Sequence, residues 1–467
     1  MASDNGDGGS MQSLKLTFGI AIFFSLFLGG LALMYSMDGQ LDSGEFSSLI
    51  KSNKKMKLSN RDFEVSEITS KVGKVEDEPS ALFNDPAISQ AWGLKKSDAA
   101  RAWSITKGNR KLVAAIIDTG IDEKHEDLKV NLWVNAGETG LDKSGKDKAT
   151  NGIDDDGNGF IDDVNGWNFV SNNNKLTDNH GHGTHIAGII GAEAGNGKGI
   201  IGIAPEVSLM VLKYYDPTVT NSDNLKNTVK AIHYAIKMGA TVINYSGGGT
   251  EYSQEEFDAV QEAEKKGILL VAAAGNERSN SDQFHYYPAD YKLSNLISVT
   301  ALDPSLEVLS SSNYGVETVD LAAPGQNILS TLPGNTYGFL TGTSQATAFV
   351  TGAAILIMAK KPAFKFQDVK KHILATGDVF SGLAAKTRSS RKLNLYKCLT
   401  ILDEGVAASG IMANTNTEQK FNSANAQFGL GGKGASSNLS PFGKDLLEAV
   451  KKPKNDKLGA KPADGFQ

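Results

Sequence analysis

The sequence predicts an α/β fold, a doubly wound and mostly parallel sheet flanked by helices, with an N-terminal transmembrane helix before it. Two observations predict the sheet: short apolar runs recur along the middle of the chain, and helix-like segments alternate with them. Runs that are apolar throughout are typical of strands buried on both faces of a parallel sheet. The expected strands span 112–117, 207–213, 241–246, 268–275 and 296–302.

Two helices between these strands can be predicted from spacing and from end signals. The segment 221–238 places Leu225, Val229, Ile232 and Ile236 on one helical face. A second helix is expected to begin with a capping box formed by Ser253 and Glu256, and to end at Gly267. In a doubly wound sheet, sites form where the carboxyl ends of strands meet the amino ends of helices.

The two ends of the chain differ from this middle part. Residues 16–37 contain no charge over 22 positions, which is long enough for a helix to cross a bilayer of ~30 Å. We therefore expect a cytoplasmic tail at 1–15, a signal anchor at 16–37, a linker or short prosegment at 38–87, the α/β domain at 88–405 and a low-complexity, disordered tail at 406–467. This arrangement predicts a cell-envelope protein, anchored with the α/β domain on the extracytoplasmic side or alternatively secreted.

Composition narrows the class of protein further. The net charge of −6, with 21% charged residues, is that of an ordinary soluble domain and gives no sign of a nucleic-acid partner. The single cysteine, Cys398, excludes an intrachain disulfide and is expected to be a packing residue.

Three segments each deliver one reactive side chain. They are "AAIIDTGID" (114–122) with Asp118, "NHGHGTHIAGIIG" (179–191) with His182, and "GFLTGTSQATAFVTGAA" (338–354) with Ser344. A serine is a weak nucleophile until a base takes its proton, and the base needs an acid to orient it. A fourth segment, "VAAAGN", ends an expected strand at Asn276, whose amide can donate to an oxyanion.

Two other chemistries use parts of the same segments. An Asp-Thr-Gly sequence also occurs in carboxylate-dyad proteases, but the other candidate aspartate, Asp42 in "LDSG", follows no apolar strand. A zinc site from His180, His182 and His185 would have ligand spacings of two and three, without the i,i+4 pair of a zinc-protease helix.

Residues 88–402 resemble the catalytic domain of a subtilisin-like serine protease. The matching stretches, in the family's order, are "AIIDTGID", "HGTHIAG", "GIIGIAP", "INYSGGG", "VAAAGN", "DLAAPG" and "GTSQATAFVTG". The resemblance implies a serine endopeptidase acting on proteins or peptides, with Asp118 as orienting acid, His182 as base and Ser344 as nucleophile. It also implies that Asn276 donates to the oxyanion.

The resemblance also implies where substrate binds. The family adds the substrate as a β-strand beside the segment that corresponds to Ser246, Gly247 and Gly248, because glycines permit close approach of a backbone. The segment from Ala272 to Gly275, including Ala273, is then the other wall of the pocket for the side chain before the cut. Tyr286 lies where the family often has a small residue; pointing inward it predicts a shallow pocket, and pointing outward a deeper one.

The chain departs from the family pattern in three further respects. Gln345 stands where the family usually has Met, and Ala348 where it usually has Pro. The stretch 38–78 is short for the folded prosegment that such proteases commonly carry. Self-maturation is therefore not implied by the resemblance.

An acidic, glycine-rich loop predicts a calcium site. In "NGIDDDGNGFIDDVNGWNF" the alternating oxygen-bearing residues resemble the first half of an EF-hand loop, although Asn165 stands at the twelfth position in place of Glu. The predicted ligands are Asp154, Asp156, Asn158 and Asp162. The resemblance adds a second calcium site at Asp127, with the loop around Asn196. The alternative for the first loop is a solvated acidic turn.

Two other functions remain open for such a sequence. A binding protein can keep this fold without catalysis, and a transpeptidase uses the same triad. The retention of all four catalytic-type residues favours an active enzyme over a silent one.

Overall fold

The computed structural model describes residues 56–58, 61–63 and 83–401. The chain divides into two units, Met1–Glu76 and Asp77–Gln467. In the first unit, β1 (Met56–Leu58) pairs with β2 (Arg61–Phe63) in an antiparallel ribbon. The predicted membrane span at 16–37, the tail at 406–467 and most of the segment 38–87 lie outside the described residues. Within the described part, no helix is long and apolar enough to span a bilayer.

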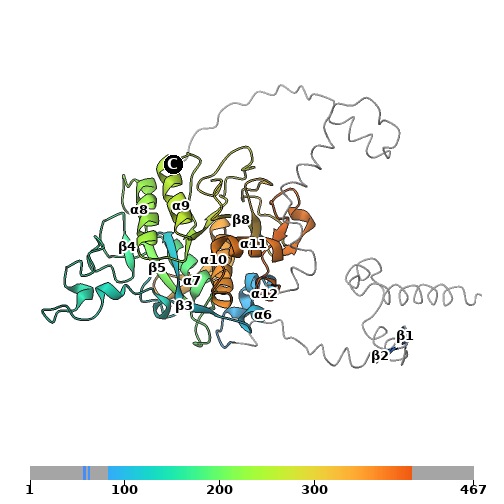
Figure 1. The fold of residues 1–467 in the computed structure, drawn as a ribbon, viewed down its shortest axis with the longest axis horizontal. Coiled ribbons are helices and arrows are strands. Elements are labelled where there is room, and N and C mark those ends of the chain that lie inside the picture. The colour runs from blue at the N-terminus through green and yellow to red at the C-terminus, as the bar shows by residue number, and fades with distance from the viewer. Residues whose placement is uncertain (1–55, 59–60, 64–82, 402–467) are drawn as a thin grey trace, which may run out of the picture. The chain divides into compact units, whose positions relative to one another are not determined.

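A nine-stranded sheet forms the centre of the second unit (Figure 1). Its order is β12-β13-β9-β8-β7-β6-β3-β5-β4, and every neighbouring pair is parallel except β12 with β13. The strands are β3 (Gly108–Asp118), β4 (Gly166–Asn168), β5 (Glu206–Lys213), β6 (Val242–Tyr245), β7 (Leu269–Ala273), β8 (Leu296–Leu302), β9 (Leu321–Pro324), β12 (Asp378–Val379) and β13 (Arg391–Lys392). The five predicted strands and the mostly parallel sheet are confirmed.

Helices cover both faces of this sheet. The α-helices are α5 (Trp92–Lys96), α6 (Ala99–Trp103), α7 (His182–Gly191), α8 (Asn224–Lys237), α9 (Gln254–Lys265), α10 (Thr343–Lys360), α11 (Phe366–Thr376) and α12 (Leu395–Thr400). Short 3₁₀ turns are η2 (Ile88–Gln90), η3 (Lys129–Asn131), η4 (Ala136–Glu138), η5 (Lys148–Thr150) and η6 (Ser381–Leu383), and β10 (Ile328–Leu332) pairs with β11 (Thr336–Leu340) in a separate hairpin.

The alternation of side chains along β3 shows why two helical layers are needed. Ala114 and Ile116 belong to the core cluster that contains α7 and α10, whereas Ala115 and Ile117 belong to the cluster that contains α8 and α9. Successive residues of a strand point to opposite faces, so a strand that is apolar at every position must be covered on both sides. Cys398 is buried in the first cluster, as predicted.

The predicted helices form, with one difference in the buried face of α8. Leu225 is 44% exposed, and the helix instead buries Asn227, Thr228, Ala231 and Tyr234, among others. Several small or polar side chains of α8 lie close to β5 and α9. Because these residues are not apolar, the apolar spacing of the sequence did not identify them as buried. At α9, Ser253 Oγ accepts from the Glu256 backbone N–H at 3.2 Å, and Gly267 follows the helix with φ +81°.

The strand order reverses at β3, which lies between β5 and β6. In such sheets the crevice at the carboxyl ends of the strands on either side of the reversal is where ligands bind. Asp118 is the last residue of β3, Ser246 follows β6, and Ala274 follows β7. The fold therefore collects most of the predicted site residues at one edge of the sheet.

Candidate active site

Asp118 and His182 are joined by a hydrogen bond at this edge. Strand β3 ends at Asp118, and α7 begins at His182, whose Nδ1 lies 2.7 Å from Asp118 Oδ1. The same carboxylate oxygen accepts the Thr119 backbone N–H at 2.8 Å, and Asp118 is only 3% exposed. This arrangement orients the imidazole through one nitrogen and leaves Nε2 for other chemistry.

The charge of Asp118 sets the basicity of the histidine. Burial alone would lower the pKa of His182, but the negative charge and the hydrogen bond of Asp118, with the charge of Asp178, outweigh it and raise that pKa above its usual value. A base with a raised pKa binds a proton more readily while a neighbouring group is losing one. His182 is thus the stronger base for having Asp118 beside it.

Asp178 is a functional neighbour that the sequence reasoning missed. Its side chain accepts five hydrogen bonds, from the Thr119 hydroxyl, the His180, Gly181 and Thr184 backbone N–H groups, and the Thr184 hydroxyl. Burial would raise the pKa of Asp178, but these bonds hold it below its ordinary value. The carboxylate therefore ties the end of β3 to the start of α7. Asp178 stands just before "HGHGTH", where an acid is favoured at the N-terminus of a helix. This sequence feature could have identified Asp178 as a candidate.

The close contact between β3 and α7 also depends on a glycine. A Cβ at Gly183 would lie 2.2 Å from the Gly120 carbonyl oxygen and 3.2 Å from Asp118 Cβ. A larger residue would push the histidine away from its acid.

Ser344 lies in the first turn of α10, close to the strand end that follows β6. It is 7% exposed, and its Oγ donates to the Ser246 carbonyl at 3.0 Å. The Ser246 hydroxyl in turn donates to the Ser344 carbonyl at 3.2 Å. Among the hydrogen bonds of the described residues, none joins Ser344 to His182. Catalytic hydrogen bonds are often long or poorly aligned before substrate binds, and they tighten in the complex.

Asn276 is held at the amino end of α10 by its side-chain oxygen. Asn276 Oδ1 accepts the Thr343 backbone N–H at 3.0 Å and the Thr343 hydroxyl at 3.3 Å. With Oδ1 engaged in this way, the Nδ2 group remains as a donor on an exposed residue beside Ser344.

The ring of Tyr286 lies between the two expected walls of the pocket. Its Cε1 atom is 2.5 Å from where a Cβ on Gly248 would stand, and its Cδ2 atom is 3.0 Å from the corresponding point on Gly275. A pair of backbone hydrogen bonds between Gly249 and Tyr287, at 2.7 and 2.9 Å, holds the next residue in place. Ala273, at the end of β7, is 3% exposed. Burial, with the charges of Glu277 and Glu256, raises the pKa of Tyr286 to about 12, so the ring is uncharged at neutral pH.

Comparison with known proteins decides the family. The profile of the subtilase family matches residues 109–431. The chain belongs to the subtilase family. Thermitase of Thermoactinomyces vulgaris is 35% identical over 68% of this chain and 98% of its own length. A thermophilic serine proteinase of Bacillus sp. (strain AK1) is 32% identical over 71% of this chain and 77% of its own length.

A third relative and a solved structure support the same family assignment. The major intracellular serine protease of Bacillus subtilis (strain 168) is 34% identical over 63% of this subtilase and 82% of its own length. The crystal structure of fervidolysin from Fervidobacterium pennivorans, described as a keratinolytic enzyme related to subtilisin, superposes with a TM-score of 0.56 at 25% identity. That match covers 68% of this chain and 46% of fervidolysin. The predicted resemblance is confirmed: this chain is a subtilisin-like serine endopeptidase.

The other histidines of "HGHGTH" have different surroundings in the subtilase fold. His180 is exposed, whereas His185 is buried with Nε2 at 2.9 Å from the Ile328 carbonyl. Burial lowers the pKa of His185 to about 4, so it packs as a neutral ring. Within residues that the structure describes, the side chains grouped closely enough to hold one metal ion include no histidine, which gives the zinc alternative no support.

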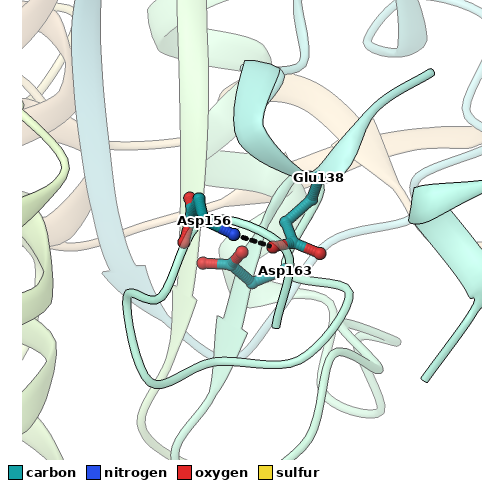
Figure 2. Close-up of side chains that lie close together, drawn as sticks. All are labelled: Glu138, Asp156 and Asp163. Atoms are coloured by element: carbon teal, nitrogen blue, oxygen red, sulfur yellow. Dashed lines mark hydrogen bonds between the residues drawn. The ribbon is translucent and has the colours of Figure 1, made fainter. Parts of the chain in front are cut away.

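The acidic loop of this subtilase brings together a set that overlaps the predicted one at a single residue. Glu138, Asp156 and Asp163 each place an oxygen within 4.8 Å of the others (Figure 2). Of the other predicted ligands, Asn158 donates through Nδ2 to Asp156 and Asp163, at 3.2 and 2.9 Å. The two carboxylates of Asp154 and Asp162 instead accept backbone N–H groups of the loop.

Asp127 is fully buried beside the loop that was predicted with it. Asn196 Nδ2 donates to its Oδ1 at 2.7 Å, and the Ile200 backbone N–H donates to its Oδ2 at 3.1 Å. Asp85 accepts backbone N–H groups from the same loop, at Gly195 and Asn196. Burial raises the pKa of Asp85, and the charge of Asp127 adds to this effect.

Proposed function

We propose that this subtilase hydrolyses peptide bonds in proteins or peptides through Asp118, His182 and Ser344, by way of an acyl-enzyme. The observation that carries the proposal is the 2.7 Å hydrogen bond between Asp118 and His182 Nδ1, at the sheet edge where α10 presents Ser344. A buried acid on one imidazole nitrogen is what a serine-activating base requires.

In the proposed reaction, the Ser344 hydroxyl leaves the Ser246 carbonyl and turns to His182 Nε2. His182 removes the proton as Ser344 Oγ forms a bond to the substrate carbonyl carbon, and the carbonyl oxygen becomes an oxyanion. Asn276 Nδ2 and the Ser344 backbone N–H donate to that oxygen. The oxyanion then collapses, the C–N bond breaks, and the proton on His182 passes to the departing amine.

Water completes the cycle. His182 takes a proton from a water molecule that attacks the ester, a second oxyanion forms, and its collapse returns the proton to Ser344 Oγ. The products are a carboxylic acid and an amine, and the enzyme is unchanged.

The test compares the full-length chain with its Ser344→Ala variant. We expect cleavage of casein and labelling by a fluorophosphonate in the parent, with turnover lower by about 10⁴-fold or more in the variant. Equal activity of the two would contradict the assignment of the nucleophile. Folded parent protein that neither cleaves nor labels would favour the silent binding protein, and ligated peptides in the product mixture would favour the transpeptidase.

The pocket beside Ser344 is proposed to accept small side chains before the cut. The ring of Tyr286 occupies the gap between Gly248 and Gly275, the two backbones that would flank the substrate side chain. Backbone pairing along Ser246, Gly247 and Gly248 remains available, because peptide groups rather than side chains make that contact. Alanine or glycine would fit where a phenylalanine ring would meet the tyrosine.

Structural calcium is proposed at Asp127. Two buried carboxylates, Asp127 and Asp85, face the same glycine-rich loop, and charges so placed are costly unless a cation or several donors offset them. Carboxylate and amide oxygens are the ligands that calcium prefers. Calorimetric titration of calcium into the parent and Asp127→Asn should show the loss of one site; an unchanged titration would contradict this assignment.

Anchoring through residues 16–37 is also proposed, with the protease domain on the extracytoplasmic side of the membrane or secreted. The support is the uncharged stretch of 22 residues, which exceeds the usual apolar region of a cleaved signal.

A further inference from the structure

The turn that carries Tyr286 is closed by one acidic side chain, that of Asp290. Asp290 Oδ2 accepts the Tyr286 backbone N–H at 2.9 Å, and the Asp290 backbone N–H donates to the Tyr286 carbonyl at 3.0 Å. Both polar groups of the Tyr286 backbone are therefore bound to a single residue. Because the backbone decides which side-chain rotamers are allowed, the position of the Tyr286 ring depends on this pair of bonds.

The Tyr286 ring in turn contacts both glycine backbones of the proposed pocket. A Cβ on Gly248 would lie 2.5 Å from Tyr286 Cε1, and a Cβ on Gly275 would lie 3.0 Å from Tyr286 Cδ2. The next residue, Tyr287, exchanges two backbone hydrogen bonds with Gly249, at 2.7 and 2.9 Å. This second pair of bonds fixes the chain directly after the ring.

Asp290 is buried, and few groups offset its charge. Its side chain is fully covered, and among the described residues Oδ1 has no hydrogen-bond partner. The ion pair recorded for it is with the half-exposed His285, whose Nδ1 lies 3.2 Å from Asp290 Oδ2. Burial raises the pKa of Asp290 to about 6, although the Tyr286 N–H and His285 oppose this effect. The charge of Asp282 adds to the rise in pKa.

A carboxylate at the position of Asp290 is costly for stability. Its unpartnered oxygen has lost water without gaining another hydrogen bond, and a neutral acceptor could close the same turn at a lower cost. Local choices that lower stability in this way are expected at functional sites. The bond from Asp290 to the backbone of a pocket residue indicates what this function is.

We propose that Asp290 is a positioning residue for the pocket beside Ser344. By holding the Tyr286 backbone N–H, Asp290 keeps the ring between Gly248 and Gly275, and so sets the preference for small side chains before the cut. The inference rests on the proposed function, in which this pocket receives the substrate side chain. Asp290 acts through Tyr286 and not by contact with substrate, because its own side chain is fully buried.

The test measures kcat/KM of the full-length chain for two peptides that differ only in alanine or phenylalanine before the cut. Asp290→Ala removes the acceptor and should shift the ratio towards phenylalanine by about 3- to 10-fold, the factor that corresponds to one net hydrogen bond. Asp290→Asn keeps an acceptor oxygen and should stay within about twofold of the parent. The assays are run near pH 8, where Asp290 of the parent is ionised.

The ratio separates a role in the pocket from a role in stability. Partial unfolding of a variant lowers both rates by the same factor, so it leaves the ratio unchanged. Asp290→Val fills the space without an acceptor, and the same shift is expected from it if Asp290→Ala does not fold.

Asp282→Ala is the matched control. Asp282 is an acid of the same segment, but it accepts the backbone N–H groups of Val316, Glu317 and Thr318. Its loss disturbs a neighbouring loop and leaves the bonds of the pocket turn in place. The ratio of kcat/KM should therefore stay within about twofold of the parent.

The Tyr286→Gly background shows whether Asp290 acts through the ring. In that background Asp290→Ala should change the ratio by less than about twofold, because the effects of two residues that act through one contact do not add. A shift of equal size in both backgrounds, an unchanged ratio in Asp290→Ala, or an equal shift in Asp290→Asn and Asp290→Ala would each overturn the role of Asp290 alone. If Tyr286→Gly itself leaves the ratio unchanged, the proposed pocket is overturned together with this inference.

Discussion

At the scale of the residue, we propose that Tyr286 decides which substrates can reach Ser344. Two neighbouring backbones, at Gly248 and Gly275, lie on either side of its ring, and the residue is partly buried between them. Sequence alone left its direction open, since a tyrosine at such a position can turn towards solvent or towards the pocket. In the structure the ring packs against both glycines, which supports the inward direction in our proposal.

A change of substrate preference should follow from Tyr286→Gly. We expect the parent to prefer peptides with alanine before the cut, and the variant to shift the ratio of kcat/KM towards phenylalanine by about 10- to 10²-fold. That range corresponds to burying a phenylalanine side chain, about 1.5–3 kcal/mol. Phe284→Gly is the matched control, because Phe284 is 68% exposed. An unchanged ratio of kcat/KM between phenylalanine and alanine peptides in Tyr286→Gly would contradict the assignment of Tyr286 to the pocket.

At the scale of the element, the first turn of α9 carries a buried acid, and ionisation of this acid lowers the stability of the fold. Glu256 is 3% exposed, and its Oε2 accepts the Tyr291 hydroxyl at 2.9 Å. Burial raises the pKa of Glu256 to about 7, although the bond from Tyr291 opposes this effect. The capping box is consequently only half formed: the Ser253 hydroxyl caps the helix, while the carboxylate faces Tyr291.

The raised pKa predicts a loss of stability as pH increases. Between the unfolded pKa near 4.5 and the folded value of about 7, the folded state binds more protons, so the free energy of unfolding falls with rising pH. The contribution of this group is at most about 3 kcal/mol. In the inactive Ser344→Ala background at saturating calcium, Glu256→Gln should therefore match the parent near pH 4.5 and exceed its stability by about 1–3 kcal/mol near pH 8.

Denaturant unfolding at the two pH values measures this difference. Glu255→Gln, at the exposed neighbouring position, should show no such pH dependence. A Glu256→Gln effect of equal size at both pH values would show that the pKa of Glu256 is not the cause.

At the scale of the whole molecule, the N-terminal stretch predicts where the protease works. The full-length chain should stay with membranes after an alkaline carbonate wash, and a variant lacking residues 16–37 should not, because only a spanning helix resists that wash. Recovery of a soluble chain that begins after residue 37 would instead indicate a cleaved signal and secretion.

The sequence by itself determined the layers of this protein and the order of its reactive groups. Uniformly apolar runs report burial on both faces of a strand, so the strands at 207–213 and 296–302 were predicted almost to the residue. The ends of strands and helices then identified Asp118, whose hydrogen bond to His182 the structure contains. These signals are local, and each can be read within one element.

Only the tertiary structure decided what depends on contacts between distant segments. Glu138 and Asp163 lie close to Asp156 because η4 and the start of β4 fold against the loop. The spacing of these residues along the chain does not predict this contact. The five bonds of Asp178 and the packing of the Tyr286 ring against Gly248 and Gly275 have the same origin. Periodicity reports which face of an element is buried, whereas the partner that a loop side chain meets is set by the packing of the whole fold.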